Sequence, residues 1–273
     1  MDISEKIPLF TNPTESITGL SIADLNRYLP AIQTAKEIVM TADDMKEGIF
    51  LADCLAGLAK LPSKSIDLII VEPPDQILAI NTEKKHNTLQ DFFKWNENWL
   101  KEAQRILKTA GSIYLLCGWH YSGMFHSLLS NIFIVQTRIT WHDERAGNQP
   151  KVRTWDNCMS DIWFATKSNE FLFNQRTVST GNIKSIKDET HFSNLWSDIF
   201  NHIPDKKNIE AEKHKALINR ILDASSFKLN YVVDPFMRGG DVGVIAKLRG
   251  RRFIGFDIDQ DNLLIAMKRI DQT

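Results

Sequence analysis

The sequence lacks several features that would mark particular classes of protein. None of its apolar runs is long enough to cross a bilayer, because "IDLIIV" and "SIYLLC" have only the length of a strand. The N-terminus has no basic region followed by an apolar stretch, so no secretory signal is expected. The net charge of −1 gives no general electrostatic reason to expect nucleic-acid binding. Any such binding must therefore be inferred from local features.

Cysteine is also scarce, with three residues in a chain of 273. Cys54, Cys117 and Cys158 are an odd number, lie far apart and have no metal-ligand spacing. They are typical of reduced thiols in an intracellular protein, cytoplasmic or nuclear depending on its source. No metal site and no membrane association are predicted, and the sequence contains no internal repeat.

The first 45 residues are loosely patterned and predict a helical extension. Ser21 and Asp24 favour a helix start, and the apolar residues that follow recur on one helical face. That face comprises Leu25, Tyr28, Leu29 and Ile32. We expect this extension to pack either on the core of the protein or on a partner.

From Gly48 onward, apolar strands alternate with amphipathic helices. Strands are predicted in "GIFL", "SIDLIIV", "SIYLLCG", "FIVQTRITWH", "DNCMSDIWFATKS", "NYVVDPF" and "RRFIGFDID". The strongest helix, "LQDFFKWNENWLKEAQRILKTAG", is predicted to turn Phe92, Trp95, Trp99 and Leu100 inward and to stop at Gly111. Continuous rather than alternating apolar strands predict an α/β fold, with a mostly parallel sheet covered by helices on both faces.

Two loops in this pattern carry chemical groups. In "VVDPFMRGGDVGVIAKLRGRRFIGFDID", a strand ends at Asp234, a glycine-containing loop opens a helix, and a second strand ends at Asp257. This arrangement suits a nucleotide whose ribose hydroxyls bind the second carboxylate, although a plain βαβ turn has a similar pattern. In the other loop, Glu72-Pro73-Pro74-Asp75, the prolines stiffen a strand exit and leave carbonyls without neighbouring donors.

With both loops in this order, the chain resembles the β-class DNA amino-methyltransferases. That family methylates the exocyclic amine of adenine or cytosine with S-adenosylmethionine, and its Asp/Ser-Pro-Pro-aromatic loop precedes its cofactor loop. "NLWSDIF" and "EKHKALINRILDASS" are also similar to family elements. The resemblance implies a Rossmann-like methyltransferase fold over residues 46–273, after the extension at 1–45, with a DNA-facing segment at 131–175. Members often dimerise, so an oligomer is expected.

The resemblance also implies roles for individual residues. The catalytic loop would be Glu72, Pro73, Pro74 and Asp75. The cofactor would lie against Asp53, Lys213, Asp234, Phe236, Arg238, Gly240 and Asp257. Phosphate contacts are expected from Arg145, Lys151 and Arg153 in "RAGNQPKVR". Trp141 and Trp155 are candidates for stacking on bases, although tryptophan is more often part of a core or an interface.

Three of these positions depart from the family pattern. Glu72 stands where Asp or Ser is expected, Asp75 replaces the aromatic residue that stacks on the flipped base, and Arg238 replaces the first glycine of the cofactor loop. These losses fall on the reactive groups rather than on the scaffold, which predicts a degenerate site with weak or absent cofactor binding. Arg238 is expected to fill the pocket by pairing with Glu72, Asp75 or Asp241.

Three functions remain open from the sequence. In the first, the chain is a non-catalytic subunit that pairs with an active nucleic-acid adenine methyltransferase and helps to bind DNA or RNA. Alternatively, it is an active but divergent adenine or cytosine methyltransferase in which Glu72 accepts from the amine. In the third interpretation it is a nucleic-acid-binding or interaction protein unrelated to methylation. The Glu-Pro-Pro sequence is similar to that of inactive partners in RNA adenosine methyltransferase pairs, which is an analogy that favours the first.

Overall fold

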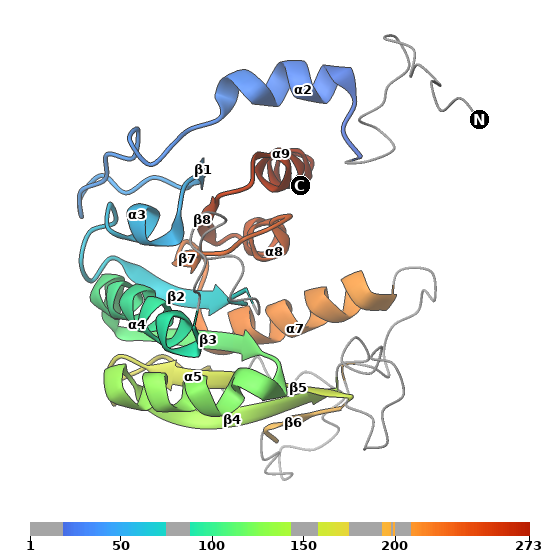
Figure 1. Ribbon diagram of the computed structural model, residues 1–273. Coiled ribbons are helices and arrows are strands. Elements are labelled where there is room, and N and C mark those ends of the chain that lie inside the picture. The colour runs from blue at the N-terminus through green and yellow to red at the C-terminus, as the bar shows by residue number, and fades with distance from the viewer. Residues whose placement is uncertain (1–18, 75–87, 143–157, 175–192, 198, 200–208) are drawn as a thin grey trace.

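The computed structural model describes residues 19–74, 88–142, 158–174, 193–197, 199 and 209–273, and these form one sheet between two layers of helices (Figure 1). The strands are β1 (Gly48–Leu51), β2 (Ile66–Val71), β3 (Leu107–Cys117), β4 (Ile134–His142), β5 (Met159–Thr166), β6 (Leu195–Trp196), β7 (Tyr231–Asp234) and β8 (Arg252–Asp257). The helices are α2 (Ile22–Tyr28), the 3-10 helix η1 (Leu29–Ala31), α3 (Cys54–Leu58), α4 (Leu89–Ile106), α5 (Trp119–Ile132), α7 (Ile209–Ser225), α8 (Asp241–Leu248) and α9 (Gln260–Asp271). Within the described ranges, no helix has both the length and the apolar character needed to cross a membrane.

The eight strands lie in the order β1-β8-β7-β2-β3-β5-β4-β6. The first five are parallel neighbours, and β6 is parallel to β4. Only β5 runs antiparallel to its neighbours β3 and β4, an arrangement that needs no helical crossover between β4 and β5. The predicted Rossmann-like, mostly parallel α/β fold is confirmed.

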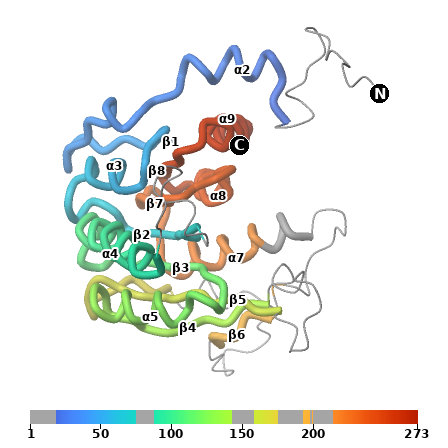
Figure 2. Tube along the Cα trace, viewed as in Figure 1, coloured from blue at the N-terminus to red at the C-terminus, as the bar shows by residue number. Residues whose placement is uncertain are grey.

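Alternate residues of the central strands enter two different hydrophobic cores. Helices α3, α4 and α5 cover one face of the sheet, and α7, α8 and α9 cover the other, as the Cα trace in Figure 2 also shows. The first core takes Ile69, Val71, Ile113 and Leu115 from β2 and β3, and the second takes Leu68, Ile70, Tyr114 and Leu116. Burial on both faces explains why these strands are continuously apolar, since each such side chain contributes roughly 1.5–3 kcal/mol when buried.

Helix α4 ends earlier than the sequence predicts, at Ile106 rather than at Gly111. The backbone N–H groups of Lys64 and Ser65 donate to the carbonyls of Arg105 and Ile106, at 3.1 and 2.8 Å, and so occupy the last turn. Strand β3 then begins directly at Leu107. Gly111 has a different role, because a Cβ there would lie 3.0 Å from the Lys108 carbonyl oxygen, where β3 passes close to neighbouring backbone.

The described part of the N-terminal extension, from Gly19 onward, packs on the core of the protein through α9. The helix start predicted at Ser21 is confirmed, since Ser21 and Asp24 form a reciprocal capping box. Leu20 and Tyr28 are buried against Leu264 of α9. The prediction is wrong for Leu29, which is 43% exposed, because the chain tightens there into the 3-10 helix and turns this side chain outward.

Polar contacts strengthen this attachment of α2 to α9. The Tyr28 hydroxyl donates to Asp271 at 3.0 Å, and the same carboxylate pairs with Arg27 at 2.7 Å. Lys268 donates to the Gly19 carbonyl and to Asp24, both at 2.8 Å. The sequence had predicted no helix at residues 260–271, so α9 and its role as the platform for the extension come from the structure alone.

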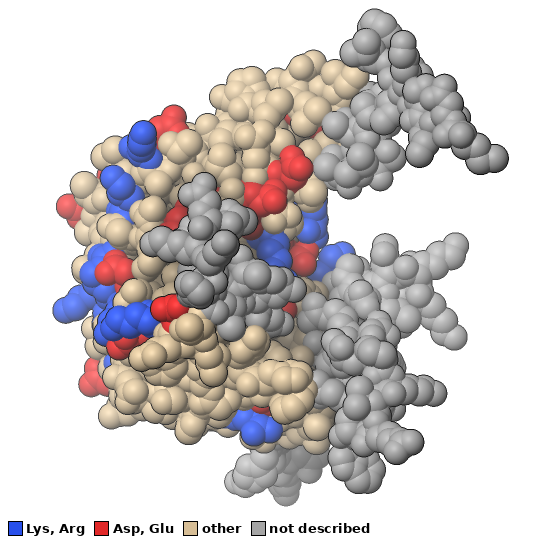
Figure 3. Space-filling view, in the orientation of Figure 1, with Lys and Arg blue, Asp and Glu red and all other residues tan. Residues whose placement is uncertain are grey.

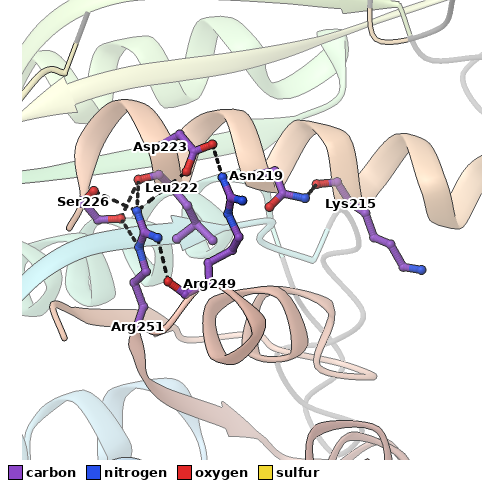
Figure 4. A network of polar contacts seen from close by, with 7 residues as sticks. All are labelled: Lys215, Asn219, Leu222, Asp223, Ser226, Arg249 and Arg251. Carbon is purple, nitrogen blue, oxygen red and sulfur yellow. Dashed lines mark hydrogen bonds and ion pairs between the residues drawn. The ribbon is translucent and has the colours of Figure 1, made fainter. Parts of the chain in front are cut away.

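Arginine side chains fix the C-terminal end of α7 to the turn between α8 and β8 (Figure 4). Arg251 donates to the carbonyls of Leu222 and Ser226, at 3.1 and 2.9 Å, and to the Ser226 hydroxyl. Arg249 forms an ion pair with Asp223. Guanidinium groups at a helix C-terminus satisfy its last carbonyls and interact favourably with the helix dipole. Helix α7 is thereby held where it forms a wall of the candidate site.

Candidate active site at the carboxyl edge of the sheet

The two loops predicted to carry chemistry follow neighbouring parallel strands. Leu68 and Ile69 of β2 pair with Val232 and Val233 of β7, so both loops leave the same edge of the sheet. From β7 the chain crosses to β8 on one side, and from β2 it crosses to β3 on the other. In open α/β sheets, ligands bind outside the carboxyl ends of the strands at such a switch point.

A cavity of about 270 Å³ lies at this point. Its apolar wall comes from β2, β3, α7, α8 and the loop after β7, and its polar wall contains side chains of both charges. The apolar lining residues are Ile70, Val71, Leu116, Ile218, Phe236, Met237 and Val242, and the polar ones are Glu72, His214, Asp234, Arg238 and Asp241. An apolar cavity with a few convergent polar groups is typical of a small-molecule site.

The two loops meet through Glu72 and Arg238. Arg238 Nη1 lies 3.5 Å from Glu72 Oε2, and the two side chains are 53% and 31% exposed. Of the two described carboxylates expected to pair with Arg238, Glu72 is therefore the one that does so. Asp75 lies outside the described residues, and Asp241 has other partners. Because the pair is partly exposed, its contribution to stability is small, about 0–1 kcal/mol.

The backbone of Arg238 keeps a conformation that favours glycine. Its φ is +47°, in the left-handed region. Its N–H donates to Asp257 Oδ2 at 2.8 Å, which ties the loop to the end of β8. Gly240 also has a positive φ of +77°, and a Cβ there would lie 2.8 Å from Ala266 Cβ. The loop thus keeps the backbone shape of a glycine-rich turn although one glycine position carries a guanidinium.

Asp234 is the most deeply buried carboxyl group of the site, with 5% of its surface exposed. Burial raises its pKa to about 7, although the Phe236 N–H donates to it at 3.0 Å. Burial also raises the pKa of Asp257, against hydrogen bonds from the backbone of Asp259 and Arg238. Neutral carboxyl groups are thereby favoured beneath the loop.

A polar network that the sequence had not predicted supports the start of α8. Arg269 of α9 forms an ion pair with Asp241 and donates to the Gly239 carbonyl at 2.6 Å. His214 Nδ1 lies 3.4 Å from Asp241, and the hydrogen bond from His214, followed by that from Arg269, lowers the pKa of Asp241. No motif in the sequence indicates these contacts, because they join α7, α8 and α9 only after the helices have packed.

The remaining predicted residues divide into three groups. Phe236 packs against Trp95 and Trp99, with ring centroids 5.5 and 5.4 Å apart, on the face of the sheet that carries α4. Asp53 caps α3 by accepting from the backbone of Leu55 and Ala56, while Pro73 and Pro74 complete the described part of their loop. Outside the described residues or side chains lie Asp75, Arg145, Lys151, Arg153, Trp155 and Lys213. Trp141 is 3% exposed in the second core, so of the two alternatives for this residue the core is confirmed and stacking on bases is not.

Basic and acidic side chains are mixed over the described surface. On the face shown in Figure 3, lysine and arginine side chains lie at the left margin, over α3 and α4, together with acidic ones. The described carboxyl edge also carries both signs of charge. Asp234 and Asp257 are buried there and favoured in the neutral form. Glu72 and Asp241 pair with Arg238 and Arg269.

Residues 66–268 match the N6/N4 family model described as DNA methylase. This range contains both loops, the cavity and most of the sheet. The chain belongs to the N6/N4 DNA methylase family. The predicted family is therefore confirmed.

Relatives of this DNA methylase-family chain include enzymes of known name. It is 26% identical to the Type II methyltransferase M.HinfI of Haemophilus influenzae, over 84% of this chain and 69% of that protein. It is also 26% identical to the DNA adenine methyltransferase YhdJ of Escherichia coli, over 82% of each chain.

Solved structures support the fold of this DNA methylase-family chain. The cytosine-N4-specific PvuII DNA methyltransferase superposes with a TM-score of 0.66 at 16% identity, over 87% of this chain and 89% of that one. The putative DNA modification methylase TTHA0409 of Thermus thermophilus, complexed with S-adenosylmethionine, gives a TM-score of 0.61 at 18% identity, over 82% and 94% of the two chains.

Proposed function

We propose that this chain is a non-catalytic DNA methylase-family subunit, which pairs with a catalytically active DNA methyltransferase and helps to hold the DNA. The observation that carries this proposal is the ion pair between Arg238 and Glu72 across the mouth of the cavity. Methylation of an exocyclic amine would require the amine to donate to the loop carboxylate. Here the guanidinium of Arg238 already pairs with the Glu72 carboxylate, so an approaching amine would have to displace it.

Arg238 also argues against the binding of S-adenosylmethionine in this cavity. S-adenosylmethionine supplies the methyl group as a sulfonium cation, and Arg238 places a second positive charge in the wall of the cavity. Like charges at a few ångströms repel, most strongly where water is excluded. The cavity of about 270 Å³ is also at the small end for a nucleotide-sized ligand. These residues do not fit the loaded cofactor well, so we expect weak or absent binding and derive no methyl transfer.

DNA contacts belong, in this proposal, to the segment 131–175 and to Arg145, Lys151 and Arg153 within it. These three residues lie outside the described part of the chain, so their role rests on the sequence. A chain that keeps the scaffold without the reactive arrangement contributes to methylation only through a second subunit that carries it.

Methyl transfer from tritiated S-adenosylmethionine to unmethylated bacterial DNA tests this proposal. The chain alone should show no transfer. Co-expression with a family member encoded beside it, one with an intact Asp-Pro-Pro-aromatic loop, should give transfer. Glu72→Gln in this chain should leave that activity within about twofold, whereas replacing the partner's loop aspartate should abolish it. Transfer by the chain alone that is lost in Glu72→Gln would contradict the proposal.

One observation favours a second candidate, an active and divergent DNA amino-methyltransferase. Glu72 keeps a carboxylate at the mouth of the cavity, and Arg238 leaves the cavity open rather than filled. The 3.5 Å separation and partial exposure make their pairing easy to break. In this alternative, the substrate amine replaces Arg238 at Glu72, and the enzyme requires no partner. Calorimetric titration of S-adenosylmethionine separates the candidates, since only the second requires micromolar binding.

A further inference from the structure

We propose that the indole of Trp119 is a stacking surface for an unpaired base of bound DNA. This inference rests on the DNA-binding part of the proposed function, but not on whether the chain transfers methyl groups. It begins from an unusual feature of the surface, because Trp119 is 55% exposed although tryptophan is usually well buried. Nothing in the sequence pattern had singled out this residue.

Trp119 lies at the edge of the sheet where the candidate site opens. Val71 of β2 pairs with Leu115 of β3 in parallel register. Beyond this pair, β2 ends and is followed by Glu72-Pro73-Pro74. Strand β3 continues to Cys117 and is followed by Gly118. Trp119 is the following residue and the first of α5. The start of α5, with Trp119, therefore lies one strand away from the exit of the Pro-Pro loop.

The neighbouring side chains extend this aromatic surface. The rings of Trp119 and His120 are stacked, with centroids 3.8 Å apart and an angle of 29° between the planes, and both residues are exposed. Helix α5, with the sequence WHYSGMFHSLLSNI, contains no acidic side chain that would repel a phosphate backbone. Tyr121, in the same turn, packs against Phe92 of α4 with ring centroids 5.2 Å apart. The first turn of α5 is thus fixed to α4, while Trp119 and His120 are exposed.

The chemistry of such a surface favours a nucleobase. Every base has a flat face that stacks on an indole, and this contact needs no particular sequence. Proteins that act on or hold single bases stack them on aromatic side chains after extrusion from the duplex. A base leaving a duplex that lies over the carboxyl edge would pass Trp119. The loop beside it has an acidic residue at position 75, whereas the indole of Trp119 is an exposed aromatic side chain at the described part of this edge.

Binding of fluorescently labelled DNA, followed by anisotropy, tests the inference. The probes are an intact duplex and the same duplex with one 2-aminopurine opposite an abasic position. Trp119→Ala should weaken binding of the abasic duplex by about 5- to 150-fold, as expected for the loss of one stacked base. Trp119→Phe should restore most of that loss. Phe227→Ala is the matched control, because Phe227 is 53% exposed at the opposite edge of the sheet, before β7, and it should bind both probes as the native chain does.

A second readout separates stacking from a structural role. The native chain and Trp119→Phe should quench 2-aminopurine at the unpaired position, and Trp119→Ala should not. Equal quenching and affinity in the native chain and Trp119→Ala would overturn the inference. A change of mass in sedimentation for Trp119→Ala, with DNA binding unchanged, would also overturn it by assigning the indole to a protein interface. If the native chain binds neither probe, this inference and the DNA-binding part of the proposed function both fail. Methyl transfer by the chain alone would contradict only the proposed non-catalytic role.

Discussion

The backbone N–H of Arg238 donates to Asp257 at 2.8 Å, so the loop is anchored to the end of β8 through its main chain. The guanidinium of the same residue extends in another direction, to Glu72. The main chain of Arg238 thus anchors the loop to β8, and its side chain obstructs the approach to Glu72. A change confined to the side chain should alter the chemistry of the cavity while the loop keeps its shape.

Arg238→Gly should therefore increase the affinity for S-adenosylmethionine, because it removes the positive charge and suits the left-handed φ of +47°. We expect at least a tenfold gain, equivalent to about 1.4 kcal/mol, measured by isothermal titration calorimetry. Lys64→Gly is the matched control, since Lys64 also has a positive φ, of +58°, but lies far from the cavity lining. Equal affinity in all three chains would show that Arg238 does not govern the cofactor site.

Stability should fall with rising pH because of Asp234. Burial raises its pKa from 3.8 to about 7, so between these values the folded chain holds a proton that the unfolded chain releases. The free energy of unfolding should decrease through this window, by on the order of 4 kcal/mol, and level off above it. Urea unfolding at several pH values should show a smaller decrease in Asp234→Asn, which cannot titrate. Taking the difference between the two chains cancels the opposite contributions of Asp24 and Glu97, whose pKa values are lowered. Parallel curves would contradict the burial argument.

The attachment of the N-terminal extension should contribute measurably to stability. Leu20 is 1% exposed beneath α2, and Leu20→Ala should reduce the free energy of unfolding by about 2–5 kcal/mol. Ile22, at the start of the same helix, is 52% exposed, and Ile22→Ala should change it by less than about 0.5 kcal/mol. Chemical unfolding followed by circular dichroism measures both. Similar small effects would mean that the extension does not belong to the cooperative unit.

Arg251 should be important for α7 and hence for the wall of the cavity. Arg251→Met removes the donors to the Leu222 and Ser226 carbonyls, and we expect a loss of about 2–3 kcal/mol. Arg251→Lys should recover only part of it, because one ammonium cannot span acceptors arranged for a planar fork. Lys228→Met, at an exposed position nearby, is the control. The rate of hydrogen exchange in α7 should increase only in the Arg251 variants. An unchanged exchange rate of α7 in these variants would contradict the role of Arg251.

Much of the scaffold could be predicted from local pattern. Apolar runs such as Ile66–Val71 and the capping pair Ser21 and Asp24 indicate their elements directly, because period and hydrogen bonding are properties of a few neighbouring residues. The end of α4 could not be found in this way. Gly111 has the character of a helix stop, yet the carbonyls of the last turn are taken by the distant residues Lys64 and Ser65, and the glycine serves a close passage of backbone.

The candidate site shows the same division. The order of the two loops, their carboxylates and the unusual arginine are properties of the sequence, and they sufficed for the family and for expecting Arg238 to pair with Glu72, Asp75 or Asp241. The structure shows the pair with Glu72. The support of Asp241 by Arg269, the burial that shifts the pKa of Asp234, the exposure of Trp119 and the burial of Trp141 were decided by the tertiary structure. Each depends on which helix packs over which strand, and a side chain's solvation and long-range partners exist only once that packing has formed.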